Sequence, residues 1–181
     1  MRLGITAFRG TVGALFFAHG AQKLFGWFGG HGLEATAGAF DSMGLKPGKR
    51  NAAVAGASEA GGGALLALGL ATPVAAAALI GVMGQAVRTV HLDKGLFVTD
   101  GGYEYNLVLG AAAFALADAG PGPWSLDERL GIRAKGPLVA LAALGAGLAG
   151  PALIEKLAPA VAEPEQAPVP EPAPEPVPAT A

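Results

Sequence analysis

Ionisable and polar side chains that could bind or protonate a small molecule are scattered through an otherwise apolar chain. Glu59, Glu104 and Lys23 are the candidates for catalytic proton transfer, because an acid and a base held close together can exchange a proton with a bound substrate. The candidates for substrate binding, which would hydrogen-bond a polar head group, are His19, Gln85, Arg88 and His91. No sequence-local ligand motif such as His-x-x-x-His accompanies them, so no metal site is predicted.

Charge is scarce elsewhere in the chain. Of its 181 residues, 52% are hydrophobic and 14% are charged, about half the charged fraction of an ordinary globular protein. This composition excludes a disordered chain and a nucleic-acid-binding protein with a basic face, and it argues against a water-soluble enzyme. The chain has no cysteine, which excludes thiolate metal ligands and dithiol redox chemistry within it.

The elements that must position these side chains are five long apolar segments: residues 3–25, 52–70, 73–90, 103–117 and 138–154. A helix needs about 20 residues to cross the hydrocarbon core of a bilayer. The fourth segment is the weakest candidate, because its uninterrupted apolar run covers only 107–117. The second and fifth segments lack the polar stripe of a soluble helix, which disfavours a water-soluble bundle. We therefore predict an all-α integral membrane helical bundle, with a four-helix core and a fifth transmembrane helix.

The connections between the segments differ in character. Residues 71–72, just before a proline, predict a tight turn and so an antiparallel hairpin of the second and third segments. Residues 26–51 are expected to form a long connection, and residues 119–136 an interfacial turn anchored by Trp124. We expect three parts along the chain: a membrane domain over 1–132, a fifth transmembrane helix over 133–157, and a disordered tail rich in proline, glutamate and alanine over 158–181.

Five alternating spans would bring the candidate side chains to one side of the membrane. With the N-terminus on side A, residues 26–51 and 91–102 lie on the opposite side B, and all seven candidates fall in the B half. Two bases there oppose two acids, so the charges balance. A charge at the centre of a membrane helix costs about 2.5–3.5 kcal/mol, so we expect these groups to share a polar pocket on side B.

Two other interpretations stay open. Long charged side chains near segment ends can reach the headgroups and have no further role, which applies to Lys23, Arg88, His91 and Glu104. Glu59 lies deeper in its segment, and a bridge from it to a lysine or arginine would fix helix register without catalysing anything. The orientation of the chain is also open. When residues inside the membrane segments are left out and the amino terminus is counted, both sides carry five positive charges.

Several motifs occur together in the order expected of a known family. They are His-Gly-Ala-Gln-Lys-Leu-Phe-Gly-Trp-Phe-Gly-Gly at 19–30, Glu59 with the glycine-rich run that ends at Pro73, Gly-Gly-Tyr-Glu-Tyr at 101–105, and Gly-Pro-Gly-Pro-Trp-Ser-Leu-Asp at 120–127. Over about residues 3–132 the chain resembles the DoxX family of small bacterial membrane proteins. The resemblance implies a four-helix core and a multi-pass protein of the bacterial inner membrane. The family's polar positions correspond here to Lys23, Glu59 and Glu104.

Family members have been linked to membrane oxidoreductase assemblies, which include thiosulfate–quinone oxidation and oxidative-stress complexes. The resemblance therefore implies a subunit of a quinone-linked membrane oxidoreductase or redox-stress complex, without a redox centre of its own and with a quinone as the possible cofactor. Its partners would be the lipid bilayer, other protein subunits or a soluble redox partner, and further copies of the chain, but no nucleic acid. The alternatives are a non-catalytic membrane scaffold and a small-solute or proton-coupled transporter.

Overall fold

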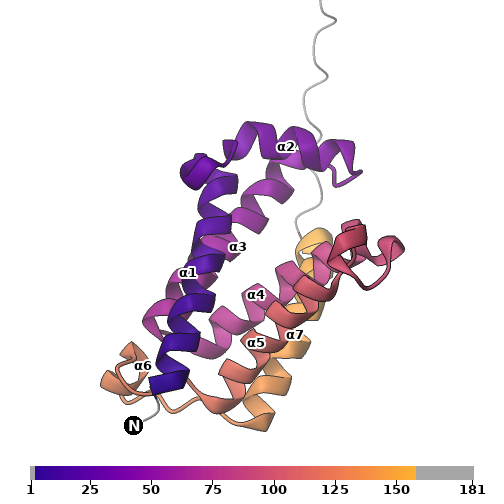
Figure 1. Cartoon of the computed structure of the whole chain (residues 1–181). Helices are drawn as coiled ribbons and strands as arrows, with labels where there is room; N and C mark the ends of the chain where they lie inside the picture. The colour runs from indigo at the N-terminus through magenta and orange to yellow at the C-terminus, as the bar shows by residue number, and fades with distance from the viewer. Residues whose placement is uncertain (1–2, 158–181) are drawn as a thin grey trace, which may run out of the picture.

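The computed structural model describes residues 3–157, in which all regular structure is helical (Figure 1). The long helices are α1 (Leu3–Phe25), α3 (Gly48–Leu68), α4 (Thr72–Ala86), α5 (Glu104–Ala119) and α7 (Pro137–Leu157). They correspond to the five apolar segments, so the all-α prediction is confirmed. The expected tail over 158–181 lies outside the described residues.

Shorter helical segments lie between the long ones. They are η1 (Trp27–Gly29) and α2 (Gly32–Ser42) after α1, the π-helical η2 (Val87–His91) and the 3₁₀ segments η3 (Leu92–Lys94) and η4 (Val98–Asp100) after α4, and α6 (Leu126–Arg129) before α7. The connection over 26–51 is thus more ordered than expected. Its last residues belong to α3, which begins at Gly48, where the backbone N–H donates to Asp41 at 2.7 Å.

The long helices alternate in direction, as the sequence predicted. End A of the bundle contains the N-terminus of α1, the α3–α4 turn and residues 120–136, whereas end B contains α2 and residues 92–103 (Figure 1). The turn between α3 and α4 is tight because Gly69 ends α3 in the left-handed region, at φ 63°, and Thr72 already begins the next helix. The predicted antiparallel hairpin is therefore present.

Helices α1 and α3 pack with their backbones in direct contact. A Cβ atom at Gly63 of α3 would lie 2.6 Å from the carbonyl oxygen of Gly13, and one at Gly20 of α1 would lie 2.6 Å from that of Gly56. Each close approach pairs an early residue of one helix with a late residue of the other, so the two helices are antiparallel. Small residues are what allow helix backbones to approach this closely.

One apolar core joins the helices, and α4 lies against α3, α5 and α7. Its largest fully buried apolar side chains come from four helices: Phe16 of α1, Leu66 of α3, Leu79 of α4 and Leu116 of α5. Helix α7 approaches α4 closely, since a Cβ atom at Gly81 would lie 2.9 Å from the carbonyl oxygen of Gly147. The fifth apolar segment is therefore an integral part of the bundle.

Two helical stretches within residues 3–157 are long and apolar enough to cross a membrane: Thr72–Lys94 and Pro137–Ile154. The first of these comprises α4 together with η2 and η3. Helix α5, at 16 residues, is short for a span, while α1 and α3 have sufficient length but contain Arg9 and Glu59. Crossing of the membrane by α1, α3 and α5 remains a prediction from the sequence.

Candidate functional site

Lys23 and Glu59 form a buried ion pair near end B. The ammonium nitrogen of Lys23, in the last turn of α1, lies 2.5 Å from Oε2 of Glu59 in α3. The side chain of Glu59 is 5% exposed and that of Lys23 is 26% exposed. Gly56 makes room for this arrangement, because a Cβ atom there would lie 3.3 Å from Cβ of Lys23. The close packing of α1 on α3 thus brings the two charges together.

A small pocket adjoins the pair. Its volume is about 230 Å³, and its lining residues are Gln22, Lys23, Gly29, Gly30, His31 and Thr36. The amide of Gln22 donates to the carbonyl oxygen of Phe28 at 3.1 Å, which ties η1 to α1. Thr36 of α2 donates to the carbonyl oxygen of Gly32 at 2.7 Å. The segment missed in the sequence, α2 with η1, therefore supplies the outer wall of the pocket.

The pair and the pocket together can present a hydrogen-bond donor to a bound oxygen. A lysine ammonium has three N–H donors and no acceptor, so the bond to Glu59 leaves donors of Lys23 for a molecule in the pocket. Glu59 needs this cation, because an unpaired carboxylate at its burial would be costly. His31 lines the same pocket, and it was not among the candidates for substrate binding.

The remaining candidates lie elsewhere. At the end of α4, Arg88 donates to Oε1 of Gln85 at 2.9 Å, and Nδ1 of His91 lies 2.6 Å from the carbonyl oxygen of Gly101. Oε1 of Glu104 accepts from the backbone N–H of Val98 at 2.9 Å. The His91 contact ties η2 to the loop over 92–103, and the Glu104 bond ties that loop to the start of α5.

The structure therefore divides the candidates into two groups, in contrast to the single shared pocket expected on side B. Among residues 3–157, no hydrogen bond or ion pair connects the second group to Lys23 or Glu59. Figure 1 shows the reason: the B ends of α1 and α3 diverge from those of α4 and α5. His19 belongs to neither group, because its side chain is exposed on α1.

A comparison with known protein families matches residues 4–92 to the DoxX family model. This chain belongs to the DoxX family. The matched DoxX region runs from α1 to the start of η3, so it contains Lys23, Glu59 and the pocket beside them, whereas Glu104, α5 and α7 lie beyond it. The DoxX family is membrane-associated. Comparisons with curated proteins and with solved structures found no match.

A second buried polar cluster connects the DoxX region to the rest of the chain at end A. Asp127 of α6 is 1% exposed, and its carboxylate accepts from the backbone N–H groups of Ala71 and Thr72 at 2.8 and 3.0 Å and from the Thr72 hydroxyl at 2.9 Å. A carboxylate placed there satisfies free N–H groups and complements the dipole of α4. Arg9 is also buried beside this cluster, within the electrostatic reach of Asp127.

None of the residues of this cluster was among the candidates predicted from the sequence. The available signal was Ser125 followed three residues later by Glu128, which is the pattern of a helix capping box. The Ser125 hydroxyl does accept from the backbone N–H of Glu128, at 3.2 Å. Within residues 3–157, no group of three or more acidic, histidine or cysteine side chains could hold a metal ion.

Proposed function

We propose that the chain is a multi-pass protein of the bacterial inner membrane, with α1, α3, α4, α5 and α7 crossing the bilayer. Support comes from the apolar side chains on the outer surface of the bundle, such as Val74, Val108 and Leu138, which is 82% exposed. So much exposed apolar surface is rare on a soluble monomer and is expected where lipid covers it. The alternating directions of the long helices support a multi-pass topology. The two stretches that are long and apolar enough to cross a membrane also support it.

We propose further that the chain serves as a subunit of a quinone-linked membrane oxidoreductase or redox-stress complex, and that the pocket beside Lys23 takes a quinone head group. The observation that carries this proposal is the buried Lys23–Glu59 pair, with Lys23 in the pocket wall. The volume of about 230 Å³ is below the roughly 300–1,000 Å³ of pockets for whole drug-sized ligands. It therefore suits a single ring, with a prenyl tail left among the lipids.

The residues fit the requirements of such a ligand. A quinone supplies two carbonyl oxygens that take up electrons and protons. Lys23 would donate a hydrogen bond to one of these oxygens, and Glu59 would hold Lys23 in place and exchange a proton with it. Neither an ammonium nor a carboxylate can donate electrons to a quinone, so the electrons would come from another subunit or a soluble redox partner. His91, Arg88, Gln85 and Glu104 would shape end B without touching the head group.

The test is the binding of a short-tailed, water-soluble quinone analogue to the purified full chain in a mild detergent. We expect Lys23→Met to weaken binding at least about tenfold. Glu34→Gln is the matched control, because Glu34 also pairs with a lysine, at 2.6 Å from Lys49, but on the exposed surface. Circular dichroism would confirm that each variant is folded. Equal binding by Lys23→Met and the wild type, or no binding by either, would refute the proposal.

One specific observation also supports a non-catalytic scaffold. A buried Lys23–Glu59 bridge between α1 and α3 is what a register-fixing contact would look like. In that case, replacing the pair with Met and Leu together would preserve the fold and every association of the chain. If the double variant still assembled with its partners and supported their activity, the scaffold would replace the quinone site as the function.

A further inference from the structure

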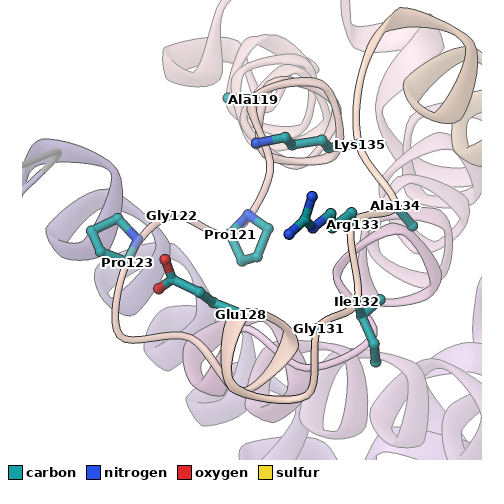
Figure 2. A pocket seen from close by; sticks show the side chains of 10 residues that line it. All are labelled: Ala119, Pro121, Gly122, Pro123, Glu128, Gly131, Ile132, Arg133, Ala134 and Lys135. Atoms are coloured by element: carbon teal, nitrogen blue, oxygen red, sulfur yellow. The ribbon is translucent and has the colours of Figure 1, made fainter.

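End A of the bundle has a larger cavity that neither the quinone site nor the scaffold uses. Its volume is about 510 Å³, and it lies between the loop after α5 and the segment that leads into α7 (Figure 2). The residues that line it are Ala119, Pro121, Gly122, Pro123, Glu128, Gly131, Ile132, Arg133, Ala134 and Lys135. Two of these, Arg133 and Lys135, are cations, and one, Glu128, is an anion.

The charges leave the cavity electropositive. Within residues 3–157, neither Arg133 nor Lys135 has a carboxylate within ion-pair distance. Figure 2 shows the guanidinium of Arg133 directed toward Pro121 across the cavity, while the carboxylate of Glu128 lies on the side of Pro123. Oε2 of Glu128 is already occupied, since it accepts from the backbone N–H of Trp124 at 3.0 Å.

The walls of the cavity are held by specific bonds. The backbone N–H of Gly136 donates to the carbonyl oxygen of Asp118 at 2.9 Å, which fixes the segment before α7 against the end of α5. The stem of Lys135 lies on Gly120, where a Cβ atom would be 2.7 Å from Cδ of Lys135, and the φ of 80° at Gly120 also favours glycine. The backbone N–H of Ile132 donates to the carbonyl oxygen of Asp127, the residue that caps α4, at 2.8 Å.

Apolar side chains accompany the lining residues: Trp124 follows Pro123, Leu130 precedes Gly131, and Ile132 itself lines the cavity. All three are exposed, and together they are called the rim of the cavity. A tryptophan at such a position is typical of the boundary between lipid and water. A molecule that suits both features has an anionic head for the cations and a hydrocarbon part for the rim.

We propose that this cavity binds the phosphate group of an anionic phospholipid. Arg133 would donate two N–H groups to the phosphate oxygens, a geometry for which guanidinium is well suited, and Lys135 would supply a second charge. The apolar rim favours a lipid over a free phosphate compound with the same head. The proposal shares the membrane location with the proposed function but does not depend on the quinone site, which lies at the opposite end of the bundle.

Trp124 provides a reporter beside the cavity. The chain has two tryptophans, so Trp27→Phe leaves Trp124 as the single source of indole fluorescence. The full chain with this substitution, in non-ionic detergent, would be titrated with dihexanoyl phosphatidylglycerol, dihexanoyl phosphatidylcholine and glycerol 3-phosphate. We expect a saturable change with phosphatidylglycerol, at least about tenfold weaker binding of phosphatidylcholine, and weaker binding of glycerol 3-phosphate.

The variants test whether the cavity itself is responsible. Combining Arg133→Gln with Lys135→Gln is expected to weaken binding of phosphatidylglycerol at least about tenfold. Arg129→Gln is the control, because Arg129 is exposed at the same end but does not line the cavity. An equal loss with Arg129→Gln would show general surface attraction, and equal affinity for glycerol 3-phosphate would show a soluble ligand; either result would overturn the proposal. Quinone binding should be the same in all these variants.

Discussion

The packing of α1 against α3 makes a sharp prediction for two glycines of the same helix. In Gly63→Ala, the added methyl group would lie 2.6 Å from the carbonyl oxygen of Gly13 and closer still to the backbone nitrogen of Phe17. Both atoms belong to the backbone of α1, which cannot rotate away as a side chain can. In Gly61→Ala, nothing lies within 4 Å of the new methyl group.

The magnitudes follow from these contacts. Overpacking costs about 1–3 kcal/mol, and a rigid backbone neighbour places Gly63→Ala near the upper value of about 3 kcal/mol. Alanine gains about 1 kcal/mol over glycine within a helix, which leaves a net loss of about 2 kcal/mol for Gly63→Ala and a net gain of about 1 kcal/mol for Gly61→Ala. A chain of this size changes its Tm by about 2–4 °C per kcal/mol. The Tm of Gly63→Ala should therefore fall by about 4–8 °C, and that of Gly61→Ala should rise by about 2–4 °C.

Thermal unfolding of the full chain in detergent, followed by far-ultraviolet circular dichroism, measures both shifts. The two variants carry the same glycine-to-alanine substitution at positions two residues apart in α3. The general effect of alanine on helix stability therefore cancels when their Tm values are compared. If Gly63→Ala had the same Tm as Gly61→Ala, the direct contact between the backbones of α1 and α3 would be wrong.

Three further predictions concern the charged groups. Lys23→Met leaves the 5% exposed Glu59 without a counter-charge and should lower the free energy of unfolding by about 3 kcal/mol. Glu59→Gln leaves Lys23 able to turn to solvent and should lower it by only about 1 kcal/mol. Equal losses of Tm in the two variants would contradict this difference. Asp127→Ala removes the acceptor of three hydrogen bonds at the start of α4 and should cost about 3 kcal/mol of stability, because each lost bond costs about 1 kcal/mol. Asp127→Asn should retain part of the cap. An unchanged Tm in both variants would exclude the capping role. Glu34→Gln breaks an exposed pair and should shift Tm by no more than about 2 °C.

The long helices could be predicted because each one contains a long run of apolar residues, and such runs are visible in the sequence. The predicted segment at 3–25 has the same bounds as α1. Helix α2 was missed because it is short, contains Glu34 and Asp41 and lies between glycines, a composition that is typical of loops. The start of α3 at Gly48 was missed because Lys49 and Arg50 are typical of a solvent-exposed loop. The first turn of a helix can also be exposed to solvent and can contain such residues.

The candidate site was predictable only in part. Alternating spans place Lys23 and Glu59 at similar depths in neighbouring helices, so a bridge between them was among the open interpretations. The separation of the Lys23–Glu59 pair from His91 and Glu104 depends on how α1 and α3 diverge from α4 and α5 at end B. The periodicity of a sequence does not encode this divergence. The cap by Asp127 was invisible because its partners are backbone groups 55 and 56 residues away.

That cap also bears on where a self-sufficient folding unit of this chain ends. The backbone N–H of Asp127 donates to the carbonyl oxygen of Gly69 at 2.8 Å, and the hydroxyl of Thr6 donates to that of Pro123 at 3.0 Å. A fragment truncated after residue 92 would therefore lose the groups that close its first three long helices together. During synthesis, Asp127 is added 55 residues after Thr72. The turn between α3 and α4 therefore lacks its cap until Asp127 has been made.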